Sequence, residues 1–439
     1  MKYPAYPKYK SSGVEWLGDV PEHWMIKRLK HKVSINDETH PETTNPDLEI
    51  IYVDISSVDS VRGIINKEPM LFENAPSRAR RIVRDGDTII STVRTYLRAI
   101  APIEKPDDNL TVSTGFAVVR PKSINKKYLS KMLIAPFFVE EVVSGSVGVS
   151  YPAINASDIG LISVPLPSDP EQQAIAEFLD RETGRIDELI GKKESLIDLL
   201  KEKRTAMISH AVTKGLKPNV KMKPSGEEWL GDVPEHWEVK RLKYLLQEPL
   251  QYGANEAAEL DDPELPRFVR ITDIDESGNL RDETFRSLPE DIAKPFLLDE
   301  GDLLFARSGA TVGKTFYYRK SWGKAAYAGY LIRARFKKRI IYPDFINYIT
   351  KSSLYAQWIN SILIQATIQN VSAEKYASYV IPMPQLNEQQ AIAEFLDRET
   401  GKIDSLISKV ESAIEKLKEY RTALISAAVT GKIDVREVA

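Results

Sequence analysis

Residues 303–341 carry the side chains best suited to binding a polyanion. The segment contains ten Lys or Arg residues and no Asp or Glu, and hydroxyl and aromatic side chains lie between the cations. Cations and hydroxyls contact phosphate oxygens, whereas arginine and planar side chains also contact base edges in a DNA groove. The residues concerned are Arg307, Ser308, Thr311, Lys314, Tyr317, Tyr318, Arg319, Lys320, Trp322, Lys324, Arg333, Arg335, Lys337, Lys338 and Arg339.

A smaller basic group lies in the first half of the chain. A run of charge is more often a solvated strand face than a binding site, and this alternative stays open for both groups. The absence of acids throughout the longer segment, in a chain with a net charge of −3, favours binding there. The residues of the first group are Arg78, Arg80, Arg81, Arg84, Ser91, Thr92, Arg94, Thr95, Tyr96 and Arg98.

Residues 309–315 are similar to a phosphate-binding P-loop but depart from it in two ways. The P-loop requires four residues between its glycines, and only three separate Gly309 from Gly313. The residues after Thr315 are strand-like, whereas a P-loop opens a helix. We therefore expect no ATP binding here. Glycines on both sides suit a loop whose backbone approaches DNA closely.

No catalytic constellation is visible in the sequence. There is no H-E-x-x-H, G-x-S-x-G or G-x-G-x-x-G motif, and the five histidines have no metal-ligand spacing. His23 and His236 occupy the same place in two copies of a repeated segment, which favours a structural role. An enzyme such as a fused methylase and nuclease would need motifs that this sequence lacks. We therefore expect no catalytic, cofactor-binding or metal-binding residue in this chain.

The composition is that of an ordinary globular protein. Of 439 residues, 42% are hydrophobic and 28% are charged, which is enough for two to four domains with normal cores. The absence of cysteine excludes disulfides and favours a reducing, cytoplasmic location. Neither a signal peptide nor a run of apolar residues long enough for a membrane span is visible.

An internal repeat organises the whole chain. Residues 13–30 (GVEWLGDVPEHWMIKRLK) and 226–243 (GEEWLGDVPEHWEVKRLK) differ at only three positions, and residues 171–184 and 388–401 are identical. Fainter echoes lie between them, such as Gly-Asp at 86–87 and 301–302. Two nearly identical frames therefore enclose two variable regions of different sequence.

A long amphipathic helix follows each variable region. Asp169 and Asn387 are expected N-caps, Gly215 and Gly431 mark the ends, and a kink or break is plausible at the internal glycines 184 and 401. Two matched heptad seams favour antiparallel pairing of the helices as a spacer, although two helices packed inside ordinary domains remain the alternative. The predicted seam residues are Ile175, Leu179, Ile186, Leu189, Leu196 and Leu200, and Ile392, Leu396, Ile403, Leu406, Leu417 and Leu424.

The variable regions are predicted to be α+β. Short apolar runs between Gly, Pro, Asp and Asn indicate strands, and residues 127–143 and 343–362 indicate helices. The expected organisation is two globular domains separated by two long antiparallel coiled-coil helices, with a pseudo-two-fold internal repeat. The boundaries are residues 1–168 for the first recognition domain, 169–215 for the first spacer helix, 216–385 for the second domain and 386–439 for the second helix.

The chain resembles the specificity subunit of a Type I restriction–modification enzyme. The resemblance rests on the WLGDVPEHW heads, the PLP and PMP domain ends, the EQQAIAEFLD helices and the segment LLFARSGATVGK, and it covers essentially all residues. It implies two target recognition domains, each reading one half of a bipartite DNA site, and helices that separate them and dock partner subunits. The first domain departs from the pattern, because residues 89–96 (IISTVRTY) lack the glycine-rich loop.

The resemblance also implies partners and a non-catalytic role. It implies double-stranded DNA, two methyltransferase subunits and two restriction subunits as partners, with S-adenosylmethionine, ATP and Mg²⁺ bound by those subunits and none by this chain. Two unlike domains predict an asymmetric target, and helix length predicts half-sites about one turn of DNA apart. A protein-interaction scaffold without a DNA role is the alternative. The expected DNA contacts are Arg78, Arg81, Ser91, Arg94, Tyr96, Arg98, Arg307, Ser308, Thr311, Lys314, Tyr318 and Lys320, centred on Arg94, Arg98, Arg307 and Lys314.

Overall fold

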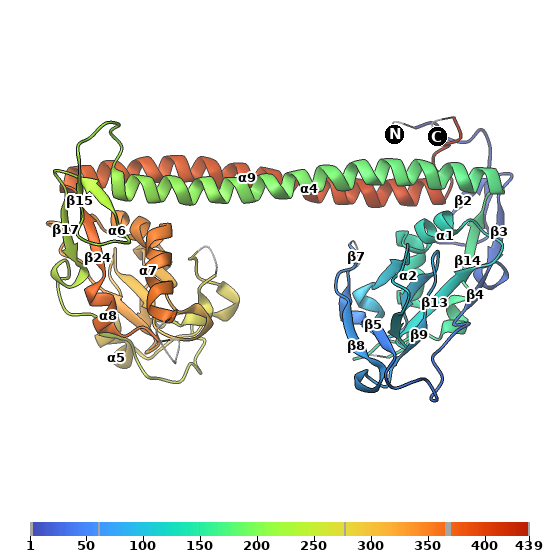
Figure 1. The fold of residues 1–439 in the computed structure, drawn as a ribbon, viewed down its shortest axis with the longest axis horizontal. Helices are drawn as coiled ribbons and strands as arrows, with labels where there is room; N and C mark the ends of the chain where they lie inside the picture. Colours follow the sequence, from blue (N-terminus) through green and yellow to red (C-terminus); the bar gives the residue numbers. More distant parts are fainter. Residues whose placement is uncertain (1–2, 60–61, 149, 276–277, 365–369, 438–439) are drawn as a thin grey trace. The chain divides into compact units, whose positions relative to one another are not determined.

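The structure is a computed structural model that describes residues 3–59, 62–148, 150–275, 278–364 and 370–437. It divides into two compact units, of which unit 1 contains Met1–Lys193 with Glu411–Ala439 and unit 2 contains Glu194–Val410. Both units combine short strands with helices, which confirms the predicted α+β class (Figure 1).

Unit 1 is built around two four-stranded sheets. One sheet has the order β11-β10-β13-β4 and is antiparallel, and the other has the order β8-β5-β12-β9 with β5 and β12 parallel. Apolar side chains from both sheets, including Val53, Ile89, Val112, Phe116 and Val118, form one core cluster. The elements are β1 (Tyr9–Ser11), β2 (Asp19–Pro21), β3 (Met25–Arg28), β4 (Val33–Ile35), β5 (Glu49–Val53), β6 (Val58–Asp59), β7 (Gly63–Ile64), β8 (Glu68–Leu71), β9 (Ala79–Ile82), β10 (Thr88–Ser91), β11 (Ile100–Pro102), β12 (Leu110–Ser113), β13 (Phe116–Pro121), α1 (Lys126–Leu133), α2 (Pro136–Ser144), α3 (Ala156–Ile159) and β14 (Ser163–Leu166).

Unit 2 repeats the central part of this plan. Its four-stranded sheet has the order β18-β23-β20-β21, and β19 and β22 form a separate parallel pair. One face of the sheet shares a core cluster with α6 and α9 through residues such as Phe305, Phe345 and Ile392. The elements are β15 (Met222–Pro224), β16 (Asp232–Pro234), β17 (Glu238–Arg241), β18 (Gln251–Tyr252), β19 (Arg267–Val269), α5 (Glu290–Ala293), β20 (Leu303–Ala306), β21 (Thr315–Tyr317), β22 (Ala325–Tyr327), β23 (Leu331–Ala334), α6 (Pro343–Thr350), α7 (Ser353–Ile364), α8 (Ala373–Ser378) and β24 (Val380–Met383).

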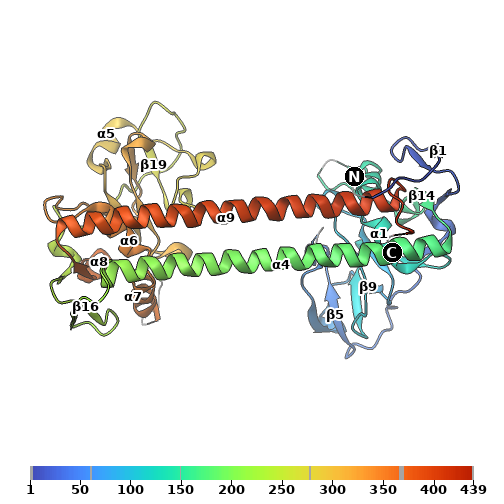
Figure 2. The same cartoon turned by 90° about the horizontal axis from the view of Figure 1, so that it is seen from above.

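The two long helices are α4 (Asp169–Lys214) and α9 (Leu386–Val429), and each contributes to both units. Within each unit a segment of α4 lies alongside a segment of α9 (Figures 1 and 2). An ion pair joins the helices in each case: Arg421 Nε lies 2.9 Å from Asp187 Oδ1 in unit 1, and Arg204 Nε lies 3.0 Å from Asp404 Oδ1 in unit 2. Because residue numbers fall along one partner as they rise along the other, the pairing is antiparallel, as predicted.

The helix interiors differ from the sequence prediction at the glycines. Both helices continue through Gly184 and Gly401 without a break. An added Cβ would meet nothing within 4 Å at either position, so these glycines lie on an open face, where they cost about 1 kcal/mol each. Packing on both sides of each glycine outweighs that cost. Helix α4 begins at Asp169 and helix α9 at Leu386, so Asp169 and Asn387 both lie inside the first turn and neither is the predicted N-cap.

The packing seam is also shifted by one residue in the middle of each helix. Leu189 and Leu196 are 43% and 41% exposed, and Leu406 is 44% exposed, whereas Ile190 and Ile197 are 9% exposed. From Leu179 the buried positions are 183, 186, 190, 197 and 200, and Lys193 occupies the remaining seam position half-buried. The prediction placed leucines in the seam where the structure places isoleucines, because both choices fit apolar spacings of three and four.

The repeated frames meet at the start of each long helix. Glu171 accepts hydrogen bonds from Trp24 Nε1 at 3.0 Å and from the Tyr6 hydroxyl at 2.7 Å, and His23 Nε2 lies 3.0 Å from its Oε2. In unit 2 His236 Nε2 lies 2.9 Å from Glu388 Oε2. The two histidines therefore pair with the first turn of a helix, in agreement with the structural role expected of them.

The glutamine that follows each of these glutamates ties the helix to the variable region. The Gln172 amide nitrogen donates to Pro167 O at 3.0 Å, and its oxygen accepts from Asn125 N at 2.9 Å. Gln389 repeats both contacts, donating to Pro384 O and accepting from Tyr342 N, each at 2.9 Å. The identical motifs thus connect the long helix to the variable region through the same contacts in both units.

Candidate nucleic-acid interface

The Gly-Asp dipeptide that recurs in both variable regions supplies the aspartate of a buried ion pair in each unit. Asp87 is 1% exposed and Asp302 is 2% exposed, and each follows a glycine with a positive φ. Arg120 Nη2 lies 2.8 Å from Asp87 Oδ2, and Arg335 Nη2 lies 2.6 Å from Asp302 Oδ2. These arginines are fixed inside their own units and are unavailable to a ligand.

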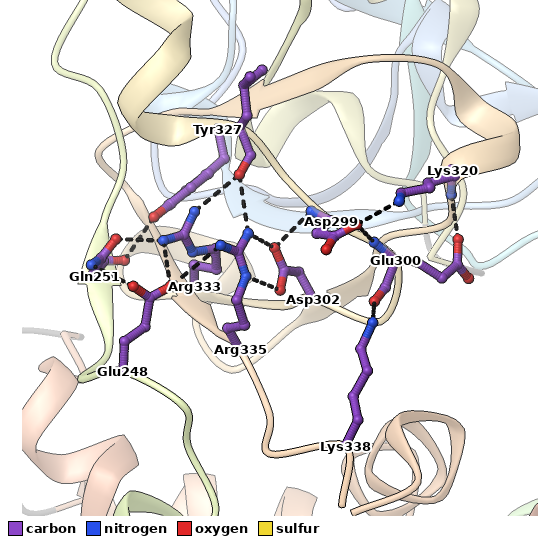
Figure 3. Close-up of polar contacts among 11 residues, drawn as sticks. Glu248, Gln251, Asp299, Glu300, Asp302, Lys320, Tyr327, Arg333, Arg335 and Lys338 are labelled. Atoms are coloured by element: carbon purple, nitrogen blue, oxygen red, sulfur yellow. Dashed lines mark hydrogen bonds and ion pairs between the residues drawn. The ribbon is translucent and has the colours of Figure 1, made fainter.

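Half of the ten cations in the basic segment of unit 2 pair with carboxylates in the same way, among them Arg333, Arg335 and Lys320 (Figure 3). Arg333 is 4% exposed, and its Nη2 lies 2.9 Å from Glu248 Oε1 and within hydrogen-bond distance of Gln251. Lys320 Nζ lies 2.8 Å from Asp299 Oδ1, and this contact lowers the pKa of the Asp299 carboxyl. Lys338 donates to a backbone carbonyl. Acidic residues from outside the segment therefore balance part of its positive charge, although the segment itself contains no acid.

Three cations of the segment lack such partners. Arg319, Lys320, Lys324, Arg333 and Arg335 pair with carboxylates, while Lys337 and Lys338 donate to carbonyls. Arg307, Lys314 and Arg339 have neither kind of partner among the described residues. One predicted contact needs correction here, because Tyr318 is 2% exposed and belongs to a core cluster. Lys320 is exposed but paired with Asp299.

The glycine-flanked loop of unit 2 is a turn between two strands. It follows β20, contains a single 3-10 turn at Gly309–Thr311, and leads into β21, so it opens no helix. Gly309 and Gly313 have φ values of 74° and 84°, in the region that favours glycine. Lys314 is exposed and Thr311 is half-buried. The exposed part of the loop is Gly309 and Lys314, whereas Gly313 is buried and its amide donates to Ala306 O.

Arg307 lies at the start of this loop against an aromatic ring. Its guanidinium carbon is 4.9 Å from the centroid of the Tyr252 ring, and Tyr252 is 41% exposed. The Nε atom is buried without a hydrogen-bond partner among the described residues. The backbone is anchored, since Arg307 N donates to Tyr330 O at 3.1 Å and Arg307 O accepts from Val371 N at 2.8 Å. Ser308 is half-buried and bridges Asn370.

The basic group of unit 1 also divides into paired and unpaired arginines. Arg78 pairs with Asp54 at 2.7 Å, Arg84 with Glu38 at 2.7 Å, and Arg98 with Glu140 at 2.6 Å. Arg81 lies half-buried in β9 with an unpartnered Nε, and burial lowers its pKa. Of the predicted contacts, Arg78 and Arg98 are thus exposed but engaged, and Arg81 is largely covered.

Arg94 is the counterpart of Arg307 in unit 1. Its guanidinium carbon lies 5.0 Å from the centroid of the Tyr151 ring, and no carboxylate of the described residues pairs with it. Its φ is 51°, a left-handed conformation that is uncommon outside glycine. Tyr96, in the same loop, is 54% exposed, but Ser91 is 2% exposed and bonds Val93 O, which removes it from the surface.

The sequence reasoning missed the tyrosines beneath these arginines. Tyr151 is 66% exposed and comes from the hairpin closed by Val147 and Ala153, while Tyr252 comes from β18. Val147, in the same hairpin, is 81% exposed. Nothing in the sequence links Tyr252 to Arg307, because 55 residues separate them; exposed tyrosines flanked by glycine or proline were the available signal.

Among the described residues no group of three or more His, Cys, Asp or Glu side chains is arranged to hold a metal ion. No helix in the described part of the chain is long and apolar enough to cross a bilayer.

Comparison with known families identifies the protein class. The family model of the Type I restriction modification DNA specificity domain matches residues 21–198 and 234–416. The chain belongs to this family. Both copies of the repeat are matched, so the duplication seen in the sequence is a duplication of the DNA specificity domain. The prediction of a Type I specificity subunit is confirmed, and with it a role in DNA sequence recognition without catalysis.

Characterised specificity subunits resemble this one over much of their length. The MjaVIII specificity subunit of Methanocaldococcus jannaschii is 27% identical over 66% of this chain and 67% of its own. The EcoKI specificity subunit of Escherichia coli K12 is 24% identical over 72% of this chain and 68% of its own. A solved chain described under the assembly and conformational transition of the type I R-M system has a TM-score of 0.69 at 22% identity, and covers 93% of this chain and 98% of that one. The fold of this specificity subunit is therefore shared with a solved one.

Proposed function

We propose that this specificity subunit reads an asymmetric, bipartite DNA target, with one half-site for each variable region. The observation that carries this proposal is the contrast between copied frames and unlike loops. The Glu171 and Glu388 motifs are identical, whereas the loops holding Arg94 and Arg307 differ in sequence. Each loop contains one 3-10 turn, but the residue before that turn is left-handed at Arg94 and extended at Ser308. Equivalent scaffolds that carry different reading surfaces support recognition of two different half-sites.

The remaining proposed contacts are those that stay accessible. Arg94, Tyr96, Arg98, Arg307, Ser308, Thr311 and Lys314 are exposed or half-buried in the loops after β10 and β20. A lysine suits phosphate contact and an arginine suits bidentate contact with a base, so Lys314 is assigned to the backbone and Arg307 to a base. Arg78 is exposed as well, but it would have to leave Asp54 in order to bind, and Arg98 would have to leave Glu140.

The long helices are proposed to dock the partner subunits. Leu189, Leu196 and Leu406 lie outside the buried seam and offer apolar side chains to a partner. We propose two methyltransferase and two restriction subunits in the complex, with S-adenosylmethionine, ATP and Mg²⁺ bound there, and a cytoplasmic location where chromosomal DNA is accessible. The twofold repeat of the frame supports two equivalent docking positions.

Methylome sequencing tests the proposal directly. A host expressing the chain with its methyltransferase should carry one new methylated motif made of two different half-sites and a spacer of fixed length. Replacing the second variable region, residues 244–379, with that of another specificity subunit should change one half-site and leave the other intact. A palindromic motif, or a change in both half-sites, would contradict the assignment of one half-site to each region.

A further inference from the structure

In the loops that follow β10 and β20, one arginine of each unit is held by an aromatic ring and pairs with no carboxylate among the described residues. Arg80 also lies over a ring, that of Phe72, but its Nε donates to the Ser77 carbonyl in the same unit. Arg94 lies over Tyr151 and Arg307 over Tyr252, with guanidinium-to-centroid distances of 5.0 and 4.9 Å. Both follow the corresponding strand of their unit, β10 or β20. The two loops differ in sequence, so the same pairing of residue types has been reached with different neighbours.

The two kinds of partner leave an arginine in different states. A carboxylate occupies the N–H edge of the guanidinium, and that contact must break before a ligand can bind. An aromatic face contacts the flat side of the group and leaves its N–H edge free to donate. Arg94 and Arg307 are therefore ready to donate to a ligand without first losing an ion pair.

The Tyr252 ring beneath Arg307 is held in place by its own hydrogen bond. The Tyr252 hydroxyl accepts a hydrogen bond from Ala373 N at 3.1 Å, at the first residue of α8. The Arg307 backbone is bonded on both sides, to Tyr330 and Val371. The buried Arg307 Nε, which has no partner among the described residues, shows that the intramolecular contacts do not satisfy this side chain. In unit 1, the positive φ of Arg94 is a strained conformation of the kind found at binding sites.

We propose that Arg94 and Arg307 each read a guanine at its major-groove edge, and that Tyr151 and Tyr252 are positioning residues that set the plane of each guanidinium. Guanine O6 and N7 are a pair of acceptors that match two N–H donors of one arginine, and no other base offers that pair in the major groove. The inference rests on the proposed function and adds the chemistry of the base that is read. It predicts at least one guanine in each half-site.

The test uses the full complex with its methyltransferase and a duplex carrying the methylome-defined target. Arg307→Lys should lower methylation of the target roughly 10- to 100-fold and flatten discrimination at one guanine of one half-site. Tyr252→Leu should reproduce a smaller loss at the same guanine. Tyr252→Phe keeps the ring and removes the contact of its hydroxyl with Ala373 N, so its loss should be smaller than that of Tyr252→Leu. Arg339→Ala, which removes an exposed cation without a partner among the described residues, is the matched control and should leave base preference unchanged.

A base analogue separates guanine reading from other contacts. Replacing that guanine by 7-deazaguanine removes the N7 acceptor, so it should weaken methylation by the wild-type complex and cause no further loss with Arg307→Ala. A loss spread evenly over all sequences, with a salt dependence reduced by about one phosphate contact, would assign Arg307 to the backbone and overturn the inference. In that case the bipartite motif would persist, whereas failure of the proposed function would remove the motif itself. Equal behaviour of Tyr252→Leu and wild type, with unchanged melting temperature, would overturn the positioning role.

Discussion

Arg333 and Arg307 belong to the same sheet region of unit 2 and have opposite surroundings. Arg333 is enclosed by Glu248, Gln251 and the Leu297 carbonyl, whereas the Arg307 side chain contacts the face of Tyr252 and pairs with no acid of the described residues. A guanidinium enclosed by acceptors adds to the integrity of the domain, and one left with free donors is available for recognition. At the residue scale, stability and binding are therefore assigned to different arginines of one basic segment.

Loss of a buried carboxylate tests this division. Asp302→Ala should destabilise unit 2 by about 3–5 kcal/mol, because it leaves Arg335 without its main partner and removes the acceptor for Asp299 N. Denaturant unfolding of the full chain measures this loss. The control Glu290→Ala removes the exposed partner of Lys324 and should cost no more than about 1 kcal/mol. Equal losses in the two variants would contradict the division.

The sequence could locate the basic residues but could not tell which of them are free. Arg307 and Lys314 were predicted as contacts and are accessible cations, but Tyr318, Ser91 and Lys320 were predicted on the same grounds and are buried or paired. The acids and carbonyls that engage the segment lie up to 93 residues away in sequence, as with Lys337 and Tyr244. Composition within a window therefore overstates the free positive charge, since folding brings acids to it from outside.

At the scale of elements, the paired helices owe their stability to a narrow buried seam. Ile190 and Ile197 lie in it, and the neighbouring Leu189 and Leu196 do not. Helix existence, approximate length and antiparallel pairing could be predicted from the heptads and from the glycines after each helix, Gly215 and Gly431, whereas the predicted N-caps and the break at the internal glycines were wrong. The phase could not, because adjacent isoleucine and leucine residues fit the same spacing, and tertiary contacts decide between them.

Truncation of neighbouring residues in α4 tests the seam. Ile190→Ala should destabilise the chain by about 2–3 kcal/mol, since it deletes buried methyl groups between packed helices. Leu189→Ala is the matched control on the adjacent exposed position and should stay within about 1 kcal/mol. Thermal or denaturant unfolding measures both. A larger loss for Leu189→Ala would restore the seam predicted from the sequence.

The ion pairs between the helices invite a charge-reversal test. Asp187→Arg should cost about 0.5–1 kcal/mol by placing a like charge beside Arg421, and Asp187→Arg combined with Arg421→Asp should recover most of it. A double-mutant cycle in unfolding experiments gives the coupling. The same cycle at Asp404 and Arg204 should give a similar value. Absence of coupling in both cycles would show that packing alone sets the register.

At the scale of the whole molecule, helix length is predicted to set the spacer of the target. Deleting residues 190–196 and 407–413 removes one heptad from equivalent positions of both helices and keeps the seam in phase. At 1.5 Å per residue this shortens each helix by roughly 10 Å, or about three base pairs. Methylome sequencing of the variant should show the same half-sites with a shorter spacer. An unchanged spacer would refute the helices as the determinant of length.

The reciprocal ion pairs have an evolutionary consequence. Asp187 and Asp404 are the same position of the repeat, as are Arg204 and Arg421, and each aspartate contacts the arginine of the other copy. A substitution of either aspartate costs about 0.5–1 kcal/mol until the arginine of the other copy changes with it, so the two copies are energetically coupled. The loops that hold Arg94 and Arg307 are not coupled to each other by ion pairs of this kind. A single chain can in this way acquire new target specificity in one half while its shared framework stays under mutual constraint.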